Sequence, residues 1–342
     1  MSGVLFRVDV GPGVGLGHVH RNLGLAEALR DLKIDGIFVL SQEDRAATRV
    51  TRKGFQVETL SRELPGQRED CSRVITTAKQ RGCTAAVVDS YVIDEYYIDQ
   101  LRSSGLHTIL IEDEIRQNSS VDLLINTSLT EDMRTIQLEM QAEKYLCGSD
   151  YVLLRSEFWN CPDRTINETV DHVLLTVGGD DWHKMTESLM VWLDSHVEDA
   201  CAITVVVGPF FDSTRLLEEV AEKSRHKVRL ITAPDCLFDL MTTVDLVVCG
   251  GGQTAYELAA TGTPAIALDF SDNQTSGVQA LVEAGTLVYG GRVRASNVPG
   301  ELVEVMDTTH QYSTRQRLSR NGQKFIDGQG AAKVAHEIAR ML

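Results

Sequence analysis

Two glycine turns carry the residues of this sequence that are best suited to chemistry. One of them, Gly251-Gly252-Gln253-Thr254-Ala255-Tyr256-Glu257, follows the apolar run Leu246–Cys249 and opens an amphipathic segment that ends near Thr261. This order predicts a strand, a tight turn and a helix. Such a turn lets backbone N–H groups and the positive end of a helix approach an anion with no Cβ in the way. The sequence therefore predicts a phosphate site here, with Asp272-Asn273-Gln274 following one strand later.

The other turn, Gly11–Gly17, follows the first apolar run and holds four glycines in seven residues. Gly15 and Gly17 let the backbone approach a bound group while the next helix presents its positive end. His18 stands at the helix entrance, where NAD-binding proteins have a small residue, so the turn is not a dinucleotide fingerprint. Because histidine titrates near neutrality, His18 is the candidate general acid or base, and the alternative is a capping or packing residue.

Two charged residues flank this turn, and each leaves two interpretations open. Arg21, one turn into the helix, either forms a surface salt bridge or anchors a phosphate or a carboxylate. Asp9, at the carboxyl end of the first strand, either orients the turn or a sugar hydroxyl, or simply caps the loop.

Composition limits the function classes. The 342 residues, 43% hydrophobic and 24% charged, suit a globular protein of about two domains. A formal net charge of −16 argues against nucleic acid and anionic membranes as partners. The seven cysteines have no C-x-x-C spacing, and no Asp, Glu or His spacing requires a metal, so we expect reduced thiols, no metal and no cofactor. We find no signal segment and no apolar run long enough to span a bilayer, which predicts a cytoplasmic protein without stable membrane insertion.

Short apolar runs alternate with helix-length segments in both halves. The predicted strands are Val4–Val10, Gly36–Leu40, Ala85–Asp89, Thr108–Glu112, Leu123–Asn126, Val173–Val177, Ile203–Val207, Val228–Ile231, Leu246–Cys249, Ala265–Leu268 and Thr286–Val288. Strict alternation predicts an α/β fold with parallel sheets covered on both faces. Residues 157–169 break the alternation and form the predicted linker. We expect two Rossmann-like domains, residues 1–156 and 170–342, facing one another across a cleft. The last helical segment, Ala331–Leu342, is assigned to the second domain, with packing back on the first as an alternative.

An ordered set of motifs resembles one family. The set comprises Arg7-x-Asp9, Gly15-Leu16-Gly17-His18-x-x-Arg21, Asp89-Ser90-Tyr91 with Asp94, Glu112-Asp113, Tyr151-Val152-Leu153-Leu154-Arg155-x-Glu157-Phe158, Gly178-Gly179-Asp180, Gly251-Gly252-x-Thr254-x-x-Glu257 and Asn273-Gln274. It resembles the pseudaminic acid pathway hydrolase, UDP-2,4-diacetamido-2,4,6-trideoxy-β-L-altropyranose hydrolase, and its relatives in spore coat polysaccharide biosynthesis. The second half alone also resembles the GT-B glycosyltransferase that adds N-acetylglucosamine to the lipid carrier of peptidoglycan.

The resemblance implies a role for each motif. The residue matching Glu257 holds the ribose hydroxyls of UDP, while the backbone of Gly251, Gly252 and Thr254 meets the diphosphate and Asn273 and Gln274 supply neutral donors. Sugar recognition falls to the first domain, through Asp89, Tyr91 and Asn126, although Tyr91 is equally well explained as a partly buried aromatic. Gly178, Gly179 and Asp180 either line the diphosphate or sugar side or form a plain strand-to-helix turn. Arg155 lies at the domain crossing, where it binds substrate or packs.

The reaction implied is hydrolysis of a UDP-linked acylamino deoxy sugar at its anomeric carbon, with His18 activating water and no metal. The principal alternative is a GT-B glycosyltransferase in which an acceptor hydroxyl replaces the water. A third class is a nucleotide-sugar-binding regulatory protein without catalysis. Fold alone does not separate these functions, because function lies in the site.

Overall fold

The computed structural model describes residues 3–11, 14–41, 44–60, 68–112, 120–127, 136–137, 141–181, 184–198, 200–270, 272–293 and 297–342. The chain divides into two compact units, Asn160–Asp327 as one and Met1–Trp159 with Gly328–Leu342 as the other. We call the unit with the N-terminus unit 1 and the other unit 2. The segment expected as a linker, 157–169, is thus divided between the units. The last 15 residues belong to unit 1 and not to the second domain, which agrees with the alternative prediction that the last helical segment packs back on the first domain.

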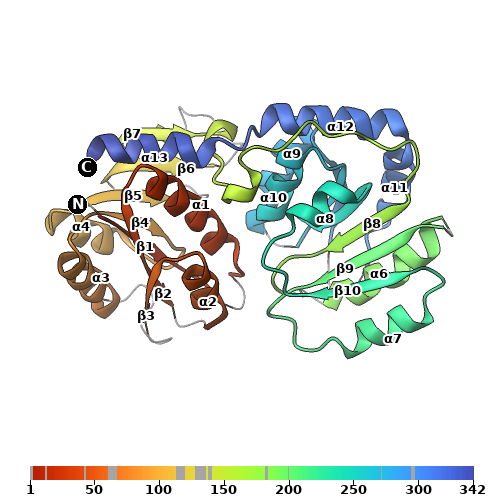
Figure 1. Cartoon of the computed structure of the whole chain (residues 1–342), viewed down its shortest axis with the longest axis horizontal. Helices are drawn as coiled ribbons and strands as arrows, with labels where there is room; N and C mark the ends of the chain where they lie inside the picture. Colours follow the sequence, from red (N-terminus) through yellow and green to blue (C-terminus); the bar gives the residue numbers. More distant parts are fainter. Residues whose placement is uncertain are drawn as a thin grey trace. The chain divides into compact units, whose positions relative to one another are not determined.

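Unit 1 is built on a parallel sheet of seven strands (Figure 1). Its strands are β1 (Gly3–Val8), β2 (Asp35–Ser41), β3 (Gln56–Leu60), β4 (Cys83–Asp89), β5 (His107–Ile111), β6 (Ser120–Asn126) and β7 (Gln141–Cys147), in the order β3-β2-β1-β4-β5-β6-β7. Its helices are α1 (Gly17–Asp31), α2 (Asp44–Arg52), α3 (Arg68–Arg81), α4 (Glu95–Ser103) and α13 (Gly330–Met341), with short 3-10 turns η1 (Ser149–Tyr151) and η2 (Ser156–Phe158).

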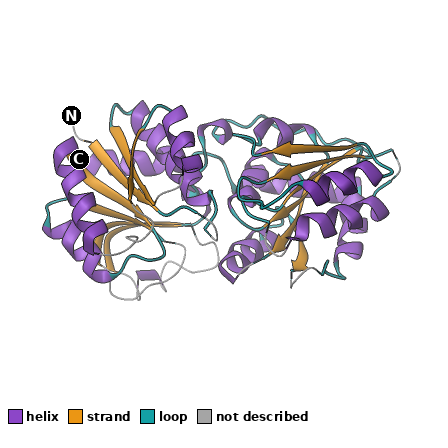
Figure 2. Ribbon diagram, turned by 90° about the horizontal axis from the view of Figure 1, so that it is seen from below, coloured by secondary structure: helices purple, strands orange, loops and turns teal. Residues whose placement is uncertain are grey.

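Unit 2 has a parallel sheet of six strands. Its strands are β8 (His172–Thr176), β9 (Ala202–Val207), β10 (Val228–Thr232), β11 (Leu246–Gly250), β12 (Ala265–Asp269) and β13 (Val288–Arg292), in the order β10-β9-β8-β11-β12-β13. Its helices are α6 (Met185–His196), α7 (Arg215–Lys223), α8 (Phe238–Thr243), α9 (Gln253–Thr261), α10 (Asp272–Glu283), α11 (Leu302–His310) and α12 (Tyr312–Phe325). In both units helices lie on both faces of the sheet, as Figure 2 shows.

The central strands, such as β1, β11 and β12, bury side chains on both faces, which is why their sequences are continuous apolar runs. One core of unit 1 packs Leu5, Val39 and Val88 of the sheet against α3 and α4. On β1 and β2, Phe6 and Phe38 stack with their ring centroids 4.8 Å apart. The core of unit 2 is similar and includes Val173, Leu175 and Val248. Each sheet is therefore a rigid platform for the loops that follow its strands.

The strand order reverses direction at one point in each sheet. In unit 1 the chain moves outward from β1 through β2 to β3, then returns to place β4 on the other side of β1. In unit 2, β11 takes the corresponding place beside β8. Loops that leave neighbouring strands in opposite directions open a crevice at their carboxyl ends, where α/β proteins bind ligands. Both predicted glycine turns follow a strand at such a point: Gly11–Gly17 after β1, and Gly251-Gly252 after β11.

The final helix completes unit 1. α13 packs against α1 and buries Val334 and Ile338 completely (Figure 1). At Gly330 an added Cβ would stand 2.2 Å from the Val152 carbonyl oxygen, so the helix start lies directly on the chain near η1. The close packing explains why this segment belongs with the first sheet although it comes last in the sequence.

Candidate functional site

His18 sits in the first turn of α1, which no side chain caps and which carries no acidic residue. The side chain is 6% exposed, and Nδ1 lies 3.0 Å from Asp89 Oδ1 at the end of β4, within ion-pair distance but not aligned for a hydrogen bond. The Tyr91 ring meets the imidazole edge-on, with centroids 4.7 Å apart and planes at 68°. With Nδ1 turned to the carboxylate, Nε2 is the nitrogen that remains for a reacting hydroxyl.

Asp89 is fully buried and has other strong partners. Arg21 donates to it through Nε (2.7 Å to Oδ2) and Nη2 (2.6 Å to Oδ1), and Asn22 donates from Nδ2 at 2.5 Å. Burial alone would raise the pKa of Asp89, but the charges of Arg21 and His18, together with the hydrogen bonds from Arg21, outweigh it and hold that pKa below its usual range. The sequence suggested a sugar contact for Asp89 and a phosphate or carboxylate anchor for Arg21. The structure pairs the two, and their geometry suits Asp89 to orienting His18.

Asp9 connects the two strands beside His18. It is 5% exposed, and its Oδ1 accepts a hydrogen bond from Arg7 Nη1 at 2.8 Å, while Oδ2 accepts bonds from Ser90 Oγ at 2.7 Å and Tyr91 N at 3.1 Å. Both oxygens of the Asp9 carboxylate therefore accept hydrogen bonds from groups within unit 1.

Behind Asp9 lies a buried polar network that the sequence did not reveal. Arg7 donates to Asp70 through Nε (3.1 Å) and Nη2 (2.8 Å), and the Tyr97 hydroxyl donates to Asp70 at 2.7 Å. Burial would lower the pKa of Arg7, but Asp70 and Asp9 outweigh it and raise that pKa further. Arg7 and Asp70 are 63 residues apart, so no local spacing could have indicated the pair.

The first glycine turn has the backbone that its composition predicts. Gly11 and Gly15 have φ values of 141° and 76°, a region that favours glycine, and Gly15 N donates to the Gly11 carbonyl at 2.8 Å. Gly17 then begins α1. Pro12 and Gly13 lie outside the described residues.

Three predicted residues of unit 1 remain, of which the structure describes Asn126 and Arg155. Asn126 ends β6 and is fully buried, and Asp113 lies outside the described residues. Arg155 is 4% exposed, with its guanidinium 5.4 Å from the centroid of the Phe158 ring, an arrangement typical of packing.

The glycine turn of unit 2 is shaped for close approach. Gly251 N donates to the Leu268 carbonyl at 2.9 Å, and a Cβ on Gly251 would stand 2.2 Å from Val278 Cγ2. Gly252 is the N-cap of α9, with no side-chain cap and no acidic residue in the first turn, and a Cβ there would meet nothing nearer than Gln274 Nε2 at 4.0 Å. The positive end of α9 therefore faces a turn without side chains.

Gln274 is oriented toward this turn. Its Oε1 accepts a hydrogen bond from Phe270 N at 3.2 Å, which leaves the amide nitrogen on the side of Gly252. Thr254 is half-buried in the first turn of α9, and Glu257 is 2% exposed one turn later. The side chain of Asn273 lies outside the described part of the chain.

A second glycine turn in unit 2 follows β8. Gly178 has a φ of 121°, and Gly208 packs so closely that a Cβ there would lie 2.4 Å from the carbonyl oxygens of Gly178 and Gly179. Asp181 Oδ1 accepts hydrogen bonds from Thr186 N (3.0 Å) and Oγ1 (2.7 Å), which fixes the start of α6. Asp180 is half-buried beside it. Gly178, Gly179 and Asp181 thus contact other residues of unit 2, and these contacts agree with either predicted role of the turn.

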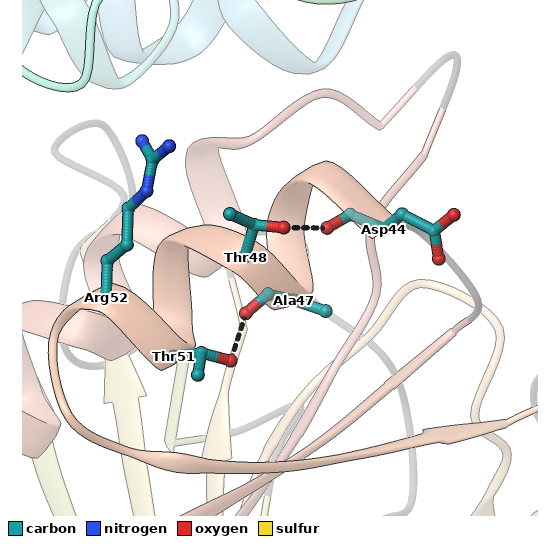
Figure 3. A pocket seen from close by; sticks show the side chains of 5 residues that line it. All are labelled: Asp44, Ala47, Thr48, Thr51 and Arg52. Carbon is teal, nitrogen blue, oxygen red and sulfur yellow. Dashed lines mark hydrogen bonds between the residues drawn. The ribbon is translucent and has the colours of Figure 1, made fainter.

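Two hollows in the described part of unit 1 lie apart from these residues. One of about 660 Å³ runs along α2 and is lined by Asp44, Ala47, Thr48, Thr51 and Arg52 (Figure 3), none of them a predicted site residue. Thr48 and Thr51 donate to the carbonyls of Asp44 and Ala47, so their hydroxyl protons are engaged within the helix. Within the described ranges, no group of three or more His, Cys, Asp or Glu is placed to hold a metal ion, and no helix is long and apolar enough to cross a membrane.

Comparison with known proteins gives relatives at low identity. No family model matches the chain. The uncharacterized protein MJ1062 of Methanocaldococcus jannaschii is 24% identical over 265 residues, which are 75% of this chain and 53% of that protein. The chain thus spans about half the length of the curated relative it matches.

Solved structures resemble the whole chain. MurG of Acinetobacter baumannii has a TM-score of 0.67 at 14% identity, covering 99% of this chain and 100% of that one. Anabaena HepE, solved in complex with UDP-glucose, has a TM-score of 0.66 at 14% identity with both chains fully covered, and the calicheamicin glycosyltransferase CalG4 has 0.65 at 12% identity, covering 99% and 98%. Together with the two parallel sheets, these matches confirm the predicted fold class: the chain has the GT-B fold of two Rossmann-like domains.

Proposed function

We propose that this chain is an enzyme that cleaves the bond between UDP and the anomeric carbon of a sugar and transfers the sugar to a hydroxyl group. The observation that carries the proposal is the pair formed by His18 and Asp89, 3.0 Å apart, at the strand reversal of unit 1. Unit 2 supplies an uncapped helix start at the corresponding point of its own sheet. The solved HepE complexes with UDP-glucose, and with UDP and glucose, make a UDP-sugar the first ligand to test.

His18 acts as the general base in this proposal. Asp89, kept charged by Arg21, stabilises the orientation and the developing positive charge of the imidazole. The acceptor O–H gives its proton to Nε2 while its oxygen forms a bond to the anomeric carbon. The bond from that carbon to the diphosphate oxygen breaks, and UDP leaves with the electron pair.

The leaving diphosphate needs charge stabilisation more than a strong acid. Backbone N–H groups at the start of α9 and the amide of Gln274 are the groups we propose for this role, and Glu257 is proposed for the ribose hydroxyls, where a carboxylate accepts two O–H bonds. Gly178, Gly179 and Asp180 are proposed to line the same ligand. Since the donors are backbone and amide groups, the scheme uses no metal.

Hydrolysis is the second candidate, and it needs only water in place of the acceptor. Two observations favour hydrolysis. The ordered motifs resemble the UDP-sugar hydrolase family. In addition, His18 is only 6% exposed, so a water molecule reaches its side chain more easily than a bulky acceptor does. The acylamino deoxy sugars of that family define the second substrate panel.

UDP release tests both candidates. Wild type and His18→Ala are incubated with UDP-glucose, UDP-N-acetylglucosamine and UDP-linked di-N-acetylated trideoxy hexoses, each with and without a panel of sugar and glycolipid acceptors. Release that requires an acceptor and disappears in the variant supports transfer, whereas release in water alone supports hydrolysis. UDP binding by calorimetry without turnover of any sugar would favour the third class, a nucleotide-sugar-binding regulatory protein, or a transferase whose acceptor is not in the panel. Absence of UDP binding refutes the proposal.

A further inference from the structure

Asp9 holds the loop after β4 in place through hydrogen bonds. Its Oδ2 accepts the hydroxyl of Ser90 and the backbone N–H of Tyr91, and the same Ser90 oxygen accepts the N–H of Val92 at 3.2 Å. Three consecutive residues are thus fixed, directly or through one hydroxyl, by a single carboxylate from the neighbouring strand. Because Asp9 and Ser90 are 5% and 3% exposed, water competes little for these bonds.

The Asp9 carboxylate is in turn held in place by Arg7. Arg7 is fully buried and bonds to Asp9 from one guanidinium nitrogen while its others bond to Asp70 on α3. Tyr97 on α4 completes the network at Asp70. Asp9 is therefore connected through Arg7 and Asp70 to two helices on one face of the sheet, α3 and α4. The positions of these helices thus help to determine the position of Asp9.

We infer that Asp9 is a positioning residue for His18, acting through Ser90 and the backbone of Tyr91 to set the Tyr91 ring against the imidazole. The ring contact, with centroids 4.7 Å apart at 68°, restricts rotation of His18 about its side-chain bonds. Asp89 lies 3.0 Å from Nδ1 and would fix that end of the ring. Tyr91 supplies a second contact and so determines where Nε2 points. The consequence for catalysis rests on the function proposed above for His18.

The test compares variants on the two sides of the Asp9 network, the loop side and the Asp70 side. This comparison distinguishes a positioning role of Asp9 from a general loss of protein stability. Ser90→Ala removes the hydroxyl that joins Asp9 to the loop, Asp9→Asn removes the charge, and Tyr91→Leu removes the ring. Tyr97→Phe is the matched control, because it removes one buried hydrogen bond of the same network on the Asp70 side and leaves every bond from Asp9 to the loop in place. Denaturant unfolding of each variant reports the stability change.

The first readout is the ¹³Cε1–¹H resonance of His18 in the full chain, assigned with His18→Gln and requiring no substrate. Because an aromatic ring 4.7 Å away shifts that proton strongly, we expect Tyr91→Leu to move the resonance and Ser90→Ala to move it part of the way, while Tyr97→Phe leaves it in place. The second readout is turnover of the sugar found above. We expect Ser90→Ala to lower kcat about 10-fold, with KM changed less than about twofold, because misplacement of a base affects the reacting geometry more than binding.

The resonance measurements test the positioning role of Asp9 whether or not the proposed sugar transfer is correct. A wild-type His18 resonance in Ser90→Ala and in Asp9→Asn would overturn it, and so would equal resonance shifts in Ser90→Ala and Tyr97→Phe at matched loss of stability. Movement of the resonance in a protein that releases UDP from no sugar would support the positioning of His18 while refuting the proposed enzyme.

Discussion

The Asp89 carboxylate contacts three side chains of α1, those of His18, Arg21 and Asn22. Its Oδ1 lies 3.0 Å from His18 Nδ1 and 2.6 Å from Arg21 Nη2, in a fully buried position. The charges of Arg21 and His18 both favour the ionised form of Asp89, and the effect of Arg21 is the larger. Loss of this carboxylate should therefore affect both stability and the orientation of His18.

We expect Asp89→Asn to lower the free energy of unfolding at pH 7 by about 3–5 kcal/mol, because breaking a buried ion pair leaves the other charge poorly compensated. The pKa of Asp89 is depressed in the folded protein, so its stabilising contribution is complete above the ordinary carboxyl pKa of about 3.9 and is lost as the pH falls toward the folded value. The difference between wild type and variant should shrink below about pH 4. Urea unfolding of wild type and Asp89→Asn at pH 7, 5 and 3 measures this difference in the free energy of unfolding. A difference that does not change with pH would contradict the lowered pKa of Asp89.

Protonation of His20 should give a second pH dependence of stability, at higher pH than that of Asp89. Burial, together with the positive charges of Arg155, Arg49 and Lys53, holds the pKa of His20 well below its ordinary value. Because the fold favours the neutral imidazole, its contribution to stability is complete above the ordinary pKa of about 6.5 and is lost as the pH falls toward the folded value. We expect wild type to lose more stability than His20→Gln between pH 7.5 and 5.5, as measured by urea unfolding. Parallel loss in the two proteins would mean that His20 does not titrate differently on unfolding.

At the scale of the element, the turn between β11 and α9 offers a matched pair of substitutions. A methyl group at Gly251 would stand 2.2 Å from Val278 Cγ2, whereas one at Gly252 has 4.0 Å of clearance and a φ of −82°. We expect Gly251→Ala to cost about 1–3 kcal/mol of stability through overpacking, and Gly252→Ala to stay within about 0.5 kcal/mol of wild type. If the turn binds a diphosphate, the Gly252 methyl obstructs it and weakens UDP binding about 10-fold or more. Calorimetry with UDP checks this, and wild-type affinity in Gly252→Ala would remove the turn from the ligand site.

The central strands could be predicted from sequence because they are buried on both faces. β3 and β7 could not: they form the two edges of the sheet in unit 1, and runs such as Gln56-Val57-Glu58-Thr59-Leu60 keep polar residues where one side faces solvent. In unit 2 the predicted strand Thr286–Val288 begins instead at Val288 and continues to Arg292, through two glycines that weaken the strand pattern.

The site was predictable only where its signal is local. Glycine-rich turns followed by His18 and by Thr254 indicate two helix starts, and the structure has α1 and α9 there. The partners of those residues come from other strands and helices: Asp89 reaches His18 only because β4 pairs with β1, and Asp70 reaches Arg7 from α3. Long-range pairing of this kind arises from topology, which residue spacing does not contain.

At the scale of the whole molecule, the two units share one pattern of strand order and differ in the side chains that come after their glycine turns. Each places a strand reversal beside its first strand and a glycine turn at that edge. In unit 1 the turn leads to an imidazole with a carboxylate partner, and in unit 2 to a helix start with amide and hydroxyl groups. The first arrangement suits proton transfer and the second suits anion binding, which supports a division of labour between the units.

The final helix makes unit 1 depend on the last residues of the chain, and α13 packs on the helix that carries His18. Ile338 is fully buried, so we expect Ile338→Ala to cost about 2–5 kcal/mol through the cavity it leaves. Hydrogen exchange followed by mass spectrometry should show lost protection in peptides of α1 and α13, with α9 of unit 2 unchanged and UDP affinity retained. Val303→Ala on α11, where Val303 is 42% exposed, is the matched control and should change neither helix. Loss of protection that is as large in α9 as in α1 would contradict the assignment of α13 to unit 1.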